Sequence, residues 1–442
     1  MKKITILLGL ATIVLSCGLV SCSSSDEEID LGEAKQVVNM LSEAQPIQLT
    51  TEQQTFANDN NSFTLNFLKT VNSVDKTGKS FIYSPLSITY VLGMVNDAAT
   101  GKTEQELEQV LGFHEGGIKA VNEYCKKLID GLPKVDEKLT LNIANALFVN
   151  QNMATLKAQY QKDMLQYYDA KAENLDFSSP TTLGTINGWA KDHTNGMIPT
   201  ILDQVDPSTV TYLLNAIYFK ADWASKFDKK NTKEESFTTE NGKIKLPLMH
   251  QNVLIQYVKN GLYSAVNIPY GNGMWKMTVL LPEDGKTTAD VINELAKYGF
   301  NNVDGKGLCN TMQESCFSPY EVDLKLPRFE TNSDTDQLDI HNGLVGLMQQ
   351  MGINLAFDPA LAEIPNMCES PVYISMMRQK AAIKVNEEGS EAAAVTIAGI
   401  KFTSAAPVEN PKATFHANRP FVYVIRESSS DVILFVGKFT GK

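Results

Sequence analysis

The order of the hydrophobic patterns along the chain constrains its fold more than any other feature. In the first part of the chain, apolar residues recur at helical spacing, as Phe56, Phe63 and Phe67 do. The last part contains two apolar runs, 421–427 and 431–439, which three serines join and which therefore predict a hairpin of strands. Because helical patterns come first and strand patterns dominate later, the sequence predicts an α+β domain with large antiparallel sheets.

Several element boundaries are also visible in the sequence. Ser84 and Pro85 provide an N-cap and a first-turn proline for a helix that follows a short strand. Thr103 and Glu106 have the spacing of a capping box, which predicts another helix start. The apolar spacing in 338–351 predicts a helix in the second half of the chain.

The first residues have the pattern of an export signal. Two lysines precede an apolar run, 4–20, which is short for a membrane span. The segment 19–22, Leu-Val-Ser-Cys, resembles a bacterial lipobox, in which the cysteine is acylated and becomes the first residue of the mature chain. We therefore expect a lipoprotein signal peptide at 1–21, an acylated Cys22, and a polar tether over 22–50.

The tether begins with the acidic run 23–28, Ser-Ser-Ser-Asp-Glu-Glu. This run resembles the signal that carries some bacterial lipoproteins to the outer face of the outer membrane, although a solvated acidic spacer has the same composition. We expect an outer-membrane lipoprotein that is exposed at the cell surface and is held to the membrane by its lipid anchor.

The remaining residues, 51–442, exceed the usual size of a domain, yet they contain no linker, repeat or low-complexity segment that would divide them. We therefore expect one large domain and a monomeric protein. The chain carries a net charge of −12. Because a nucleic-acid partner requires a basic surface that neutralises phosphates, this charge argues against nucleic acid as a partner.

Residues that carry catalysis or bind metals are sparse. The chain has five histidines, and it lacks the Gly-x-Ser-x-Gly, His-Glu-x-x-His and phosphate-binding glycine motifs. It also lacks a Cys-x-x-Cys pair, whereas Cys309 and Cys316 are close enough in sequence either to form a disulfide or to remain free thiols. We therefore expect no catalytic residue, no metal and no cofactor, and we do not expect an enzyme.

The segment 387–400, EEGSEAAAVTIAGI, is rich in small residues and lies shortly before the last strands. With the two-residue period of a strand, Ser390, Ala392 and Ala394 share one face, whereas Glu391 lies on the other. The first face carries no charge, so this segment could enter the interior of an existing sheet. A flexible surface loop explains the same composition, and the pattern alone leaves both interpretations open.

Four ordered parts of the chain, spread over about 53–442, resemble one known family, the serpins (serine protease inhibitors). They match an early strand with a buried helix, a central strand that ends in a tryptophan, the hinge of a reactive loop, and a C-terminal signature. They are FIYSPLSITYVLGMVNDAATGKTEQEL (81–107), LNAIYFKADWASKF (214–227), NEEGSEAAA (386–394), and NRPFVYVIRE with ILFVGKF (418–427 and 433–439). The resemblance covers nearly the whole chain after the tether.

The resemblance implies a serpin domain over 51–442 with three β-sheets, eight or nine helices and an exposed reactive-centre loop at about 387–415. It also implies suicide-substrate inhibition. A target protease cuts the loop, becomes acylated on it, and is trapped when the freed hinge inserts as a new strand of the main sheet. Some members of the family keep the fold without inhibiting proteases, so a non-inhibitory binding protein on the cell surface is the alternative.

The resemblance also assigns roles to individual residues. The hinge residues are Glu387, Glu388, Gly389, Ser390, Glu391, Ala392, Ala393 and Ala394. The residues at the sheet opening and in the polar cluster beneath the sheet, the shutter, are Arg328, Trp223, Ser84, Ser87, Asn215 and Gln379. Glu387 and Arg328 are expected to form an ion pair, and Gln379 stands where the family usually has a histidine.

The usual spacing in the family places the scissile bond between Thr403 and Ser404. The threonine suits elastase-like or subtilisin-like proteases, whereas the neighbouring Lys401 suits trypsin-like enzymes and Phe402 suits chymotrypsin-like or papain-like ones. We therefore expect a broad inhibitor of serine proteases, and also of cysteine proteases, that uses adjacent bonds of its loop.

Overall fold

The computed structural model describes residues 44–114, 116–298, 316–390 and 410–442. Some of the predicted features lie outside these residues. They are the signal peptide, the acylated Cys22, most of the tether, Cys309, the hinge residues 391–394, and the expected cleavage sites Lys401, Phe402, Thr403 and Ser404. The described residues include 387–390, the first half of the hinge.

The described residues form eight α-helices, most of them in the first half of the chain. The helices are α2 (Thr51–Val74), α3 (Pro85–Ala98), α4 (Gly101–Leu111), α5 (Gly117–Gly131), α6 (Ala158–Tyr168), α7 (Thr182–His193), α8 (Thr288–Tyr298) and α9 (Gly343–Gln350). In the described ranges, no helix has both the length and the apolar character that a bilayer span requires.

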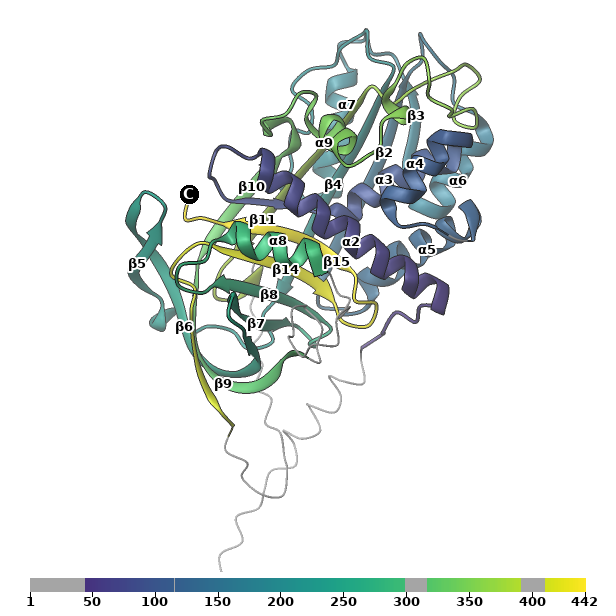
Figure 1. The fold of residues 1–442 in the computed structure, drawn as a ribbon. Coiled ribbons are helices and arrows are strands. Elements are labelled where there is room, and N and C mark those ends of the chain that lie inside the picture. Colours follow the sequence, from purple (N-terminus) through teal and green to yellow (C-terminus); the bar gives the residue numbers. More distant parts are fainter. Residues whose placement is uncertain (1–43, 115, 299–315, 391–409) are drawn as a thin grey trace, which may run out of the picture.

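Strands dominate the second half of the chain, which confirms the predicted α+β class (Figure 1). The strands are β1 (Phe81–Tyr83), β2 (Thr140–Asn150), β3 (Lys171–Leu175), β4 (Thr211–Asp222), β5 (Lys233–Thr239), β6 (Gly242–Lys259), β7 (Tyr263–Tyr270), β8 (Trp275–Pro282), β9 (Ser318–Pro327), β10 (Phe329–Asp334), β11 (Met376–Val385), β12 (Gly389–Ser390), β13 (Lys412–His416), β14 (Phe421–Glu427) and β15 (Ile433–Phe439).

Local sequence explains where two of the helices begin. The Thr50 hydroxyl accepts a hydrogen bond from the Gln53 N–H at 3.2 Å, and the Gln53 side chain accepts one from the Thr50 N–H at 3.1 Å. As predicted, Ser84 caps α3 by accepting from the Ser87 N–H at 3.4 Å, and Pro85 occupies the first turn. Each cap satisfies a backbone donor that has no partner inside its helix.

Two predicted helix boundaries are wrong. Helix α4 begins at Gly101, so Thr103 lies inside its first turn, where the hydroxyl accepts from the Glu363 N–H at 3.0 Å. The Glu363 carboxylate accepts from the Lys102 N–H at 2.7 Å, so a distant part of the chain supplies the cap. Helix α9 begins at Gly343 and not at 338. Asn342, just before it, has a φ of 60°, a left-handed conformation that a right-handed helix cannot contain.

Backbone pairing joins the strands into two sheets. The six-stranded sheet, called the main sheet below, has the order β10-β11-β12-β4-β2-β3. The nine-stranded sheet has the order β1-β15-β14-β8-β7-β6-β9-β13, with β5 paired to β6. The family resemblance implied three sheets, and the long strand β6 explains the difference in number. Its residues 248–257 pair with β9 and its residues 256–259 pair with β7, so β6 joins two sets of strands into one ladder.

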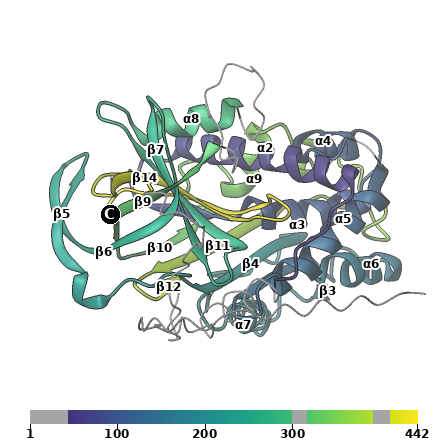
Figure 2. The same ribbon diagram turned by 90° about the horizontal axis from the view of Figure 1, so that it is seen from below.

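The main sheet lies between two layers of helices (Figure 2). Helix α7 contacts β2 and β4 on one face, and α3 contacts the same strands on the other. Alternate residues of β4 therefore enter different cores, with Tyr212 and Leu214 packed beneath α7 and Leu213 and Ile217 packed in the main core. Burial on both faces accounts for the nearly uninterrupted apolar sequence of this strand.

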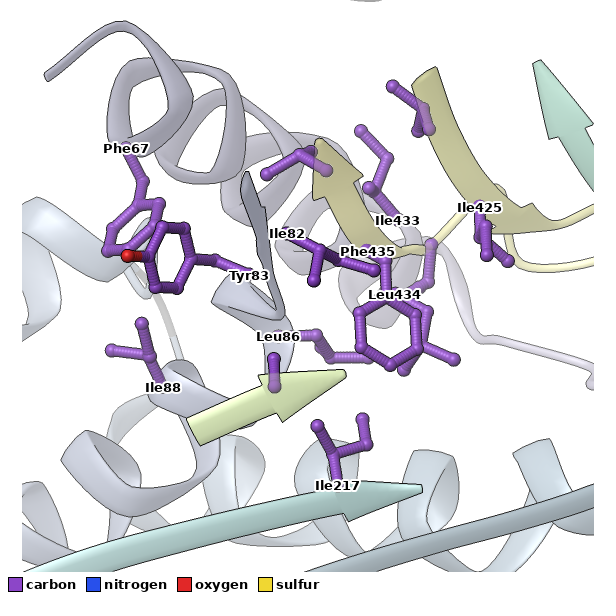
Figure 3. Packing of buried hydrophobic residues seen from close by; sticks show 14 of the residues in the cluster. Phe67, Ile82, Tyr83, Leu86, Ile88, Ile217, Ile425, Ile433, Leu434 and Phe435 are labelled. Atoms are coloured by element: carbon purple, nitrogen blue, oxygen red, sulfur yellow. The ribbon is translucent and has the colours of Figure 1, made fainter. Parts of the chain in front are cut away.

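The main hydrophobic core fills the space between the two sheets. Ile217 of β4 points toward Leu86 of α3 and Phe435 of β15, and Ile82 of β1 packs beyond them (Figure 3). All four side chains are buried. This packing fixes β4 against the second sheet, and β4 forms one wall of the site described next.

Candidate functional site at the opening of the main sheet

The seam between β4 and β11 is only partly closed. The two strands pair directly, and in parallel, over residues 212–216 of β4 and 376–380 of β11. Beyond these pairs, and within the described ranges, residues 217–220 of β4 pair only with β2, and residues 381–384 of β11 pair only with β10. Half of the seam is therefore an opening between two strands that are otherwise neighbours.

Strand β12, from the hinge, occupies the far end of this opening. Ser390 pairs in antiparallel orientation with Val385 of β11 and with Ala221 of β4, and Gly389 pairs with Asp222. A Cβ atom at Gly389 would lie 2.1 Å from the carbonyl oxygen of Ala221. Only glycine allows the backbone to approach this closely, so the hinge glycine is the entry point of the chain into the sheet.

The strands on either side of the opening keep one register along their whole length. Val385 and Ala221 both pair with Ser390 and lie opposite each other across it. Their separation along the sequence equals that of Gln379 and Asn215, which pair directly, so the register is the same on both sides of the opening. A strand that followed Ser390 into the seam would therefore need β4 and β11 to move apart sideways, but not to slide along each other.

Backbone hydrogen bonds hold the hinge to the turn that follows β4. The Trp223 N–H donates to the Glu388 carbonyl at 2.8 Å, and the Phe227 N–H donates to the Glu387 carbonyl at 3.0 Å. The indole nitrogen of Trp223 donates to the Asn386 carbonyl at 2.9 Å. The predicted tryptophan at the sheet opening thus contacts the hinge through both its backbone and its side chain.

The side chain of Ser390 points into the protein. Its hydroxyl lies 2.8 Å from the hydroxyl of Tyr270 on β7, and Ser390 is fully buried. The Tyr270 ring stacks on Trp223 with a centroid separation of 4.4 Å. Burial raises the pKa of Tyr270 far above its ordinary value, so this hydroxyl stays neutral. The leading inward position of the hinge is therefore small, uncharged and lined by aromatic rings.

Glu387 has two side-chain donors. Arg328, at the junction of β9 and β10, forms an ion pair with its carboxylate, and the Thr232 hydroxyl donates to the same oxygen at 2.7 Å. Burial opposes ionisation of Glu387, but the hydrogen bonds from Arg328 and Thr232 outweigh it and hold the pKa of this carboxyl below its ordinary value. The hinge is thereby fixed by a charged carboxylate that is almost fully buried.

Glu388 forms a second charged contact, which the sequence did not predict. Its two carboxylate oxygens accept from Lys226 at 3.0 Å and from Lys229 at 2.9 Å, and Lys226 also pairs with Asp222 at 2.9 Å. The hydrogen bonds from Lys229 and Lys226 hold the pKa of Glu388 below its ordinary value. Lys226 and Lys229 follow Trp223 in the segment after β4. Because Trp223 was already expected at the sheet opening, their short distance from it in sequence could have predicted that they contact the hinge.

Beneath the closed half of the seam lies the shutter, centred on Gln379. The Gln379 side-chain oxygen accepts from the Ser84 N–H at 2.9 Å, and its nitrogen donates to the Ser84 carbonyl at 2.9 Å. The same nitrogen donates to the Asn215 side chain at 3.1 Å. The amide group of one side chain thus pairs with both polar groups of a backbone residue, which requires one donor and one acceptor held side by side.

The neighbours of Gln379 complete a closed polar network. Ser84 donates to the Ser87 hydroxyl at 3.1 Å, and Asn215 donates to the Asn145 side chain at 2.9 Å. The backbone N–H of Gln379 donates to the Thr335 hydroxyl at 3.0 Å. All of these side chains are neutral amides or hydroxyls and are buried. The network therefore keeps its hydrogen bonds without any group that changes charge near neutral pH.

The structure brings the predicted residues together in two groups on one seam. The first, at the open end, contains Glu387, Glu388, Gly389, Ser390, Trp223 and Arg328. The second, at the closed half, contains Ser84, Ser87, Asn215 and Gln379. Sequence reasoning missed the partners Thr232, Tyr270, Lys226 and Lys229, because each contacts the hinge across more than 100 residues of chain.

Comparison with known proteins gives one family. The family described as Serpin (serine protease inhibitor) matches residues 58–441. Serpin B11 of Homo sapiens is 31% identical over 403 residues, which cover 86% of this chain and 97% of that protein. Iripin-8 of Ixodes ricinus is 30% identical over 406 residues, covering 88% of this chain and 94% of the relative.

A solved structure shows the same fold. The native state of tengpin, a thermophilic serpin, aligns with a TM-score of 0.75 at 26% identity, covering 90% of this chain and 96% of that one. The expected serpin fold is therefore confirmed. Fold, family match and relatives agree, and this chain belongs to the serpin family, whose members are in general protease inhibitors rather than enzymes.

Proposed function

We propose that this protein inhibits proteases as a suicide substrate, by inserting its cleaved reactive-centre loop between β4 and β11. The observation that carries the proposal is the position of Ser390, which already pairs with both strands while the seam beyond it is partly open. Because β4 and β11 keep one register on both sides of the opening, the sheet is prepared to accept one more strand.

Extending the register of β12 predicts the partners of the inserted strand. Residue 392 would lie level with Phe219 and Ile383, and residue 396 would lie level with Asn215 and Gln379. Ser390 faces inward, so residues 392, 394 and 396 would face inward too, and the sequence has alanine, alanine and threonine there. These small side chains suit the core, and the threonine hydroxyl would reach the shutter.

The energy of insertion supports an effective trap. About 14 new backbone pairings at roughly 1 kcal/mol each, with the apolar side chains they bury, give on the order of 10–20 kcal/mol. A strand of that length spans roughly 45–50 Å, so an acylated protease would be carried from one end of the sheet toward the other. Its active site would be distorted, and hydrolysis of the acyl bond would stall.

Incubation with elastase, subtilisin, trypsin and papain, followed by denaturing gels, tests the proposal. We expect covalent complexes with at least one of these proteases. Thermal melting before and after loop cleavage provides a second measurement, and we expect the melting temperature to rise by on the order of 20 °C on cleavage. Cleavage without complexes and without any rise would reject insertion and favour the non-inhibitory binding protein.

We also propose that the loop is cut at more than one bond among 401–404. The sequence offers Lys401, Phe402 and the Thr403-Ser404 bond to proteases of different specificity. Mass spectrometry of the C-terminal peptide released from each complex identifies the bond. Different start residues for trypsin-like and elastase-like enzymes are expected, and one start residue for all proteases would reject a multiple-bond inhibitor.

We propose further that the protein is an outer-membrane lipoprotein displayed at the cell surface. The support is the sequence pattern of residues 1–28, with Cys22 as the acylated residue. Metabolic labelling with a radioactive fatty acid, compared between wild type and Cys22→Ala, tests acylation. Protease accessibility on intact cells tests surface exposure, and loss of label with unchanged membrane association in Cys22→Ala would reject the anchor.

A further inference from the structure

A cluster of three titratable side chains lies outside the hinge and the shutter. Asp323 on β9 stands between His250 on β6 and His416 on β13. Nε2 of His250 lies 2.6 Å from one carboxylate oxygen of Asp323, and Nε2 of His416 lies 2.9 Å from the other. Each histidine therefore has its own oxygen, and one carboxylate links three neighbouring strands.

The pairing register explains why these side chains meet. His250 and His416 are both level with Lys325 of β9, one on each side, so all three lie in one row across the sheet. Asp323 precedes Lys325 by two residues and shares its face, because side chains alternate along a strand. The carboxylate thus reaches both imidazoles diagonally.

Apart from its backbone pairing, strand β13 has few other side-chain contacts with the sheet. It is the last strand of the nine-stranded sheet and pairs only with β9 among the described residues. Phe415 is its one fully buried apolar side chain, and Lys412 approaches Glu321 at 3.9 Å at its start. The contact between His416 and Asp323 therefore adds a side-chain link to the backbone pairing and the buried Phe415 that hold β13, the strand that follows residues 391–409.

We propose that His250, Asp323 and His416 form a pH-responsive fastening that holds β13 to the sheet most firmly in mildly acidic solution. Histidine side chains gain a proton between about pH 8 and 5, and each proton converts a neutral hydrogen bond to Asp323 into a charge-assisted one. The proposal concerns the attachment of β13 alone, so it does not depend on the inhibitory function proposed above.

The acid limit of the pH effect is set by the ionisation of Asp323. Partial burial opposes ionisation of Asp323, but the hydrogen bonds from His250 and His416 outweigh it and keep the pKa of this carboxyl below its ordinary value. The contribution of Asp323 is therefore present above about pH 4 and lost as pH falls through its lowered pKa. Because histidine side chains in general lose their charge as the solution becomes alkaline, the fastening is expected to be strongest in mildly acidic solution, where the carboxylate is still ionised.

Neighbouring charges do not cancel this effect. Lys325 lies between the two histidines and would oppose their protonation, but its ammonium lies 2.8 Å from both carboxylate oxygens of Glu235 on β5. Lys412 and Glu321 form the opposite pair at the other end of β13. Neither pair contains a group that ordinarily titrates between pH 5 and 8.

Amide hydrogen exchange of residues 412–416, corrected for intrinsic rates and compared at pH 5.5 and pH 8.0, tests the proposal. In the wild type we expect protection about two- to fivefold higher at pH 5.5, the range that a partly exposed ion pair supports. His416→Gln and Asp323→Asn should each remove this difference, whereas His341→Gln, outside the sheets, should keep it. All three variants replace partly exposed or exposed side chains, and their melting curves verify folding.

The exchange experiment distinguishes results that support the proposal from results that overturn it. Loss of the pH difference in both His416→Gln and Asp323→Asn, with the difference kept in His341→Gln, supports the fastening. A wild type without any pH difference, or a difference that survives in either variant of the cluster, overturns it. Because exchange is measured on the intact chain without a protease, a failure of inhibition would not affect this result.

Discussion

Replacing Ser390 by arginine tests insertion at its first step. Ser390 is fully buried, and its hydroxyl lies 2.8 Å from that of Tyr270, whose ring stacks on Trp223. An arginine on this face would have to place a guanidinium among aromatic rings, while the carboxylates around the hinge, Asp222, Glu387 and Glu388, already pair with lysines or Arg328. A buried charge without a partner costs several kcal/mol, and contact with the rings returns about 1–2 kcal/mol of it.

A net penalty of about 3 kcal/mol at the leading residue has a kinetic consequence rather than an equilibrium one. Complete insertion, at roughly 10–20 kcal/mol, would still be favourable. Because Ser390 already pairs with both strands, the arginine would displace the hinge from the seam. Its re-entry after cleavage would become slower by about 150-fold, since each 1.4 kcal/mol changes a rate tenfold. Hydrolysis of the acyl-enzyme would then precede insertion. We expect Ser390→Arg to be cleaved as a substrate, with free protease recovered.

The assay is a titration of a fixed amount of protease with wild type and variant, followed by measurement of residual activity and of covalent complex on denaturing gels. The matched control is Glu391→Arg, which places the same side chain one residue further along, on the outward face of the inserted strand. This control should keep complex formation. Equal complex yields for Ser390→Arg and wild type would refute the argument that residue 390 must enter the protein interior. Loss of complexes in Glu391→Arg alone would reverse the assignment of the inward and outward faces.

Three further predictions concern the contacts around the seam. Gln379→Leu leaves the buried Ser84 N–H without its acceptor and removes one of two donors to the Ser84 carbonyl, so it should lower the free energy of unfolding by about 2–4 kcal/mol, as measured by denaturant titration. The lowered pKa of Glu387 means that its contribution is present above about pH 4.5 and lost as pH falls through that lowered value, so exchange at residues 386–390, corrected for intrinsic rates, should accelerate below pH 4. Glu387→Gln should reduce this acid dependence, and the part that remains should come from Glu388, whose pKa is also lowered. Asp203→Asn, which removes one exposed partner of Arg378, should speed spontaneous loss of complex-forming activity by at most about fivefold during storage at 37 °C.

Patterns that depend on neighbours in sequence were predictable. The α+β class follows from the order of helical and strand patterns, and Ser84 with Pro85 marks the start of α3 because a cap acts within one turn. Thr103 shows the limit of this reasoning, since its capping spacing is local but the cap itself comes from Glu363. A side chain from a distant part of the chain replaced the local one, and no local pattern records that replacement.

The site could be predicted only as far as a resemblance extends. The resemblance named Glu387 and Arg328 as partners, and the structure places them in contact. It did not show how Gln379 could occupy the position of a histidine. The geometry answers this point, because the Gln379 amide matches the N–H and C=O of Ser84 at 2.9 Å each, a pairing that depends on where β11 passes α3. Such a match is a property of packing and not of spacing along the chain.

If the loop inserts as proposed, the closed half of the seam would supply the resistance to insertion. On its inner face, Gln379 of β11 donates to Asn215 of β4. On its outer face, Arg378 and Lys380 hold Asp203 and Thr200 of the segment between α7 and β4, at 3.1 and 2.8 Å.

Opening this half first breaks the five direct pairs and stretches these contacts, whereas the new strand forms pairs with both neighbours only after the gap has widened to about 9–10 Å. Loss therefore precedes gain at each step along the closed half, although the sum is favourable. Under the proposed mechanism, a sheet whose opening is filled only as far as Ser390 would thus remain intact for long periods and still hold free energy that one cleavage in the loop would release.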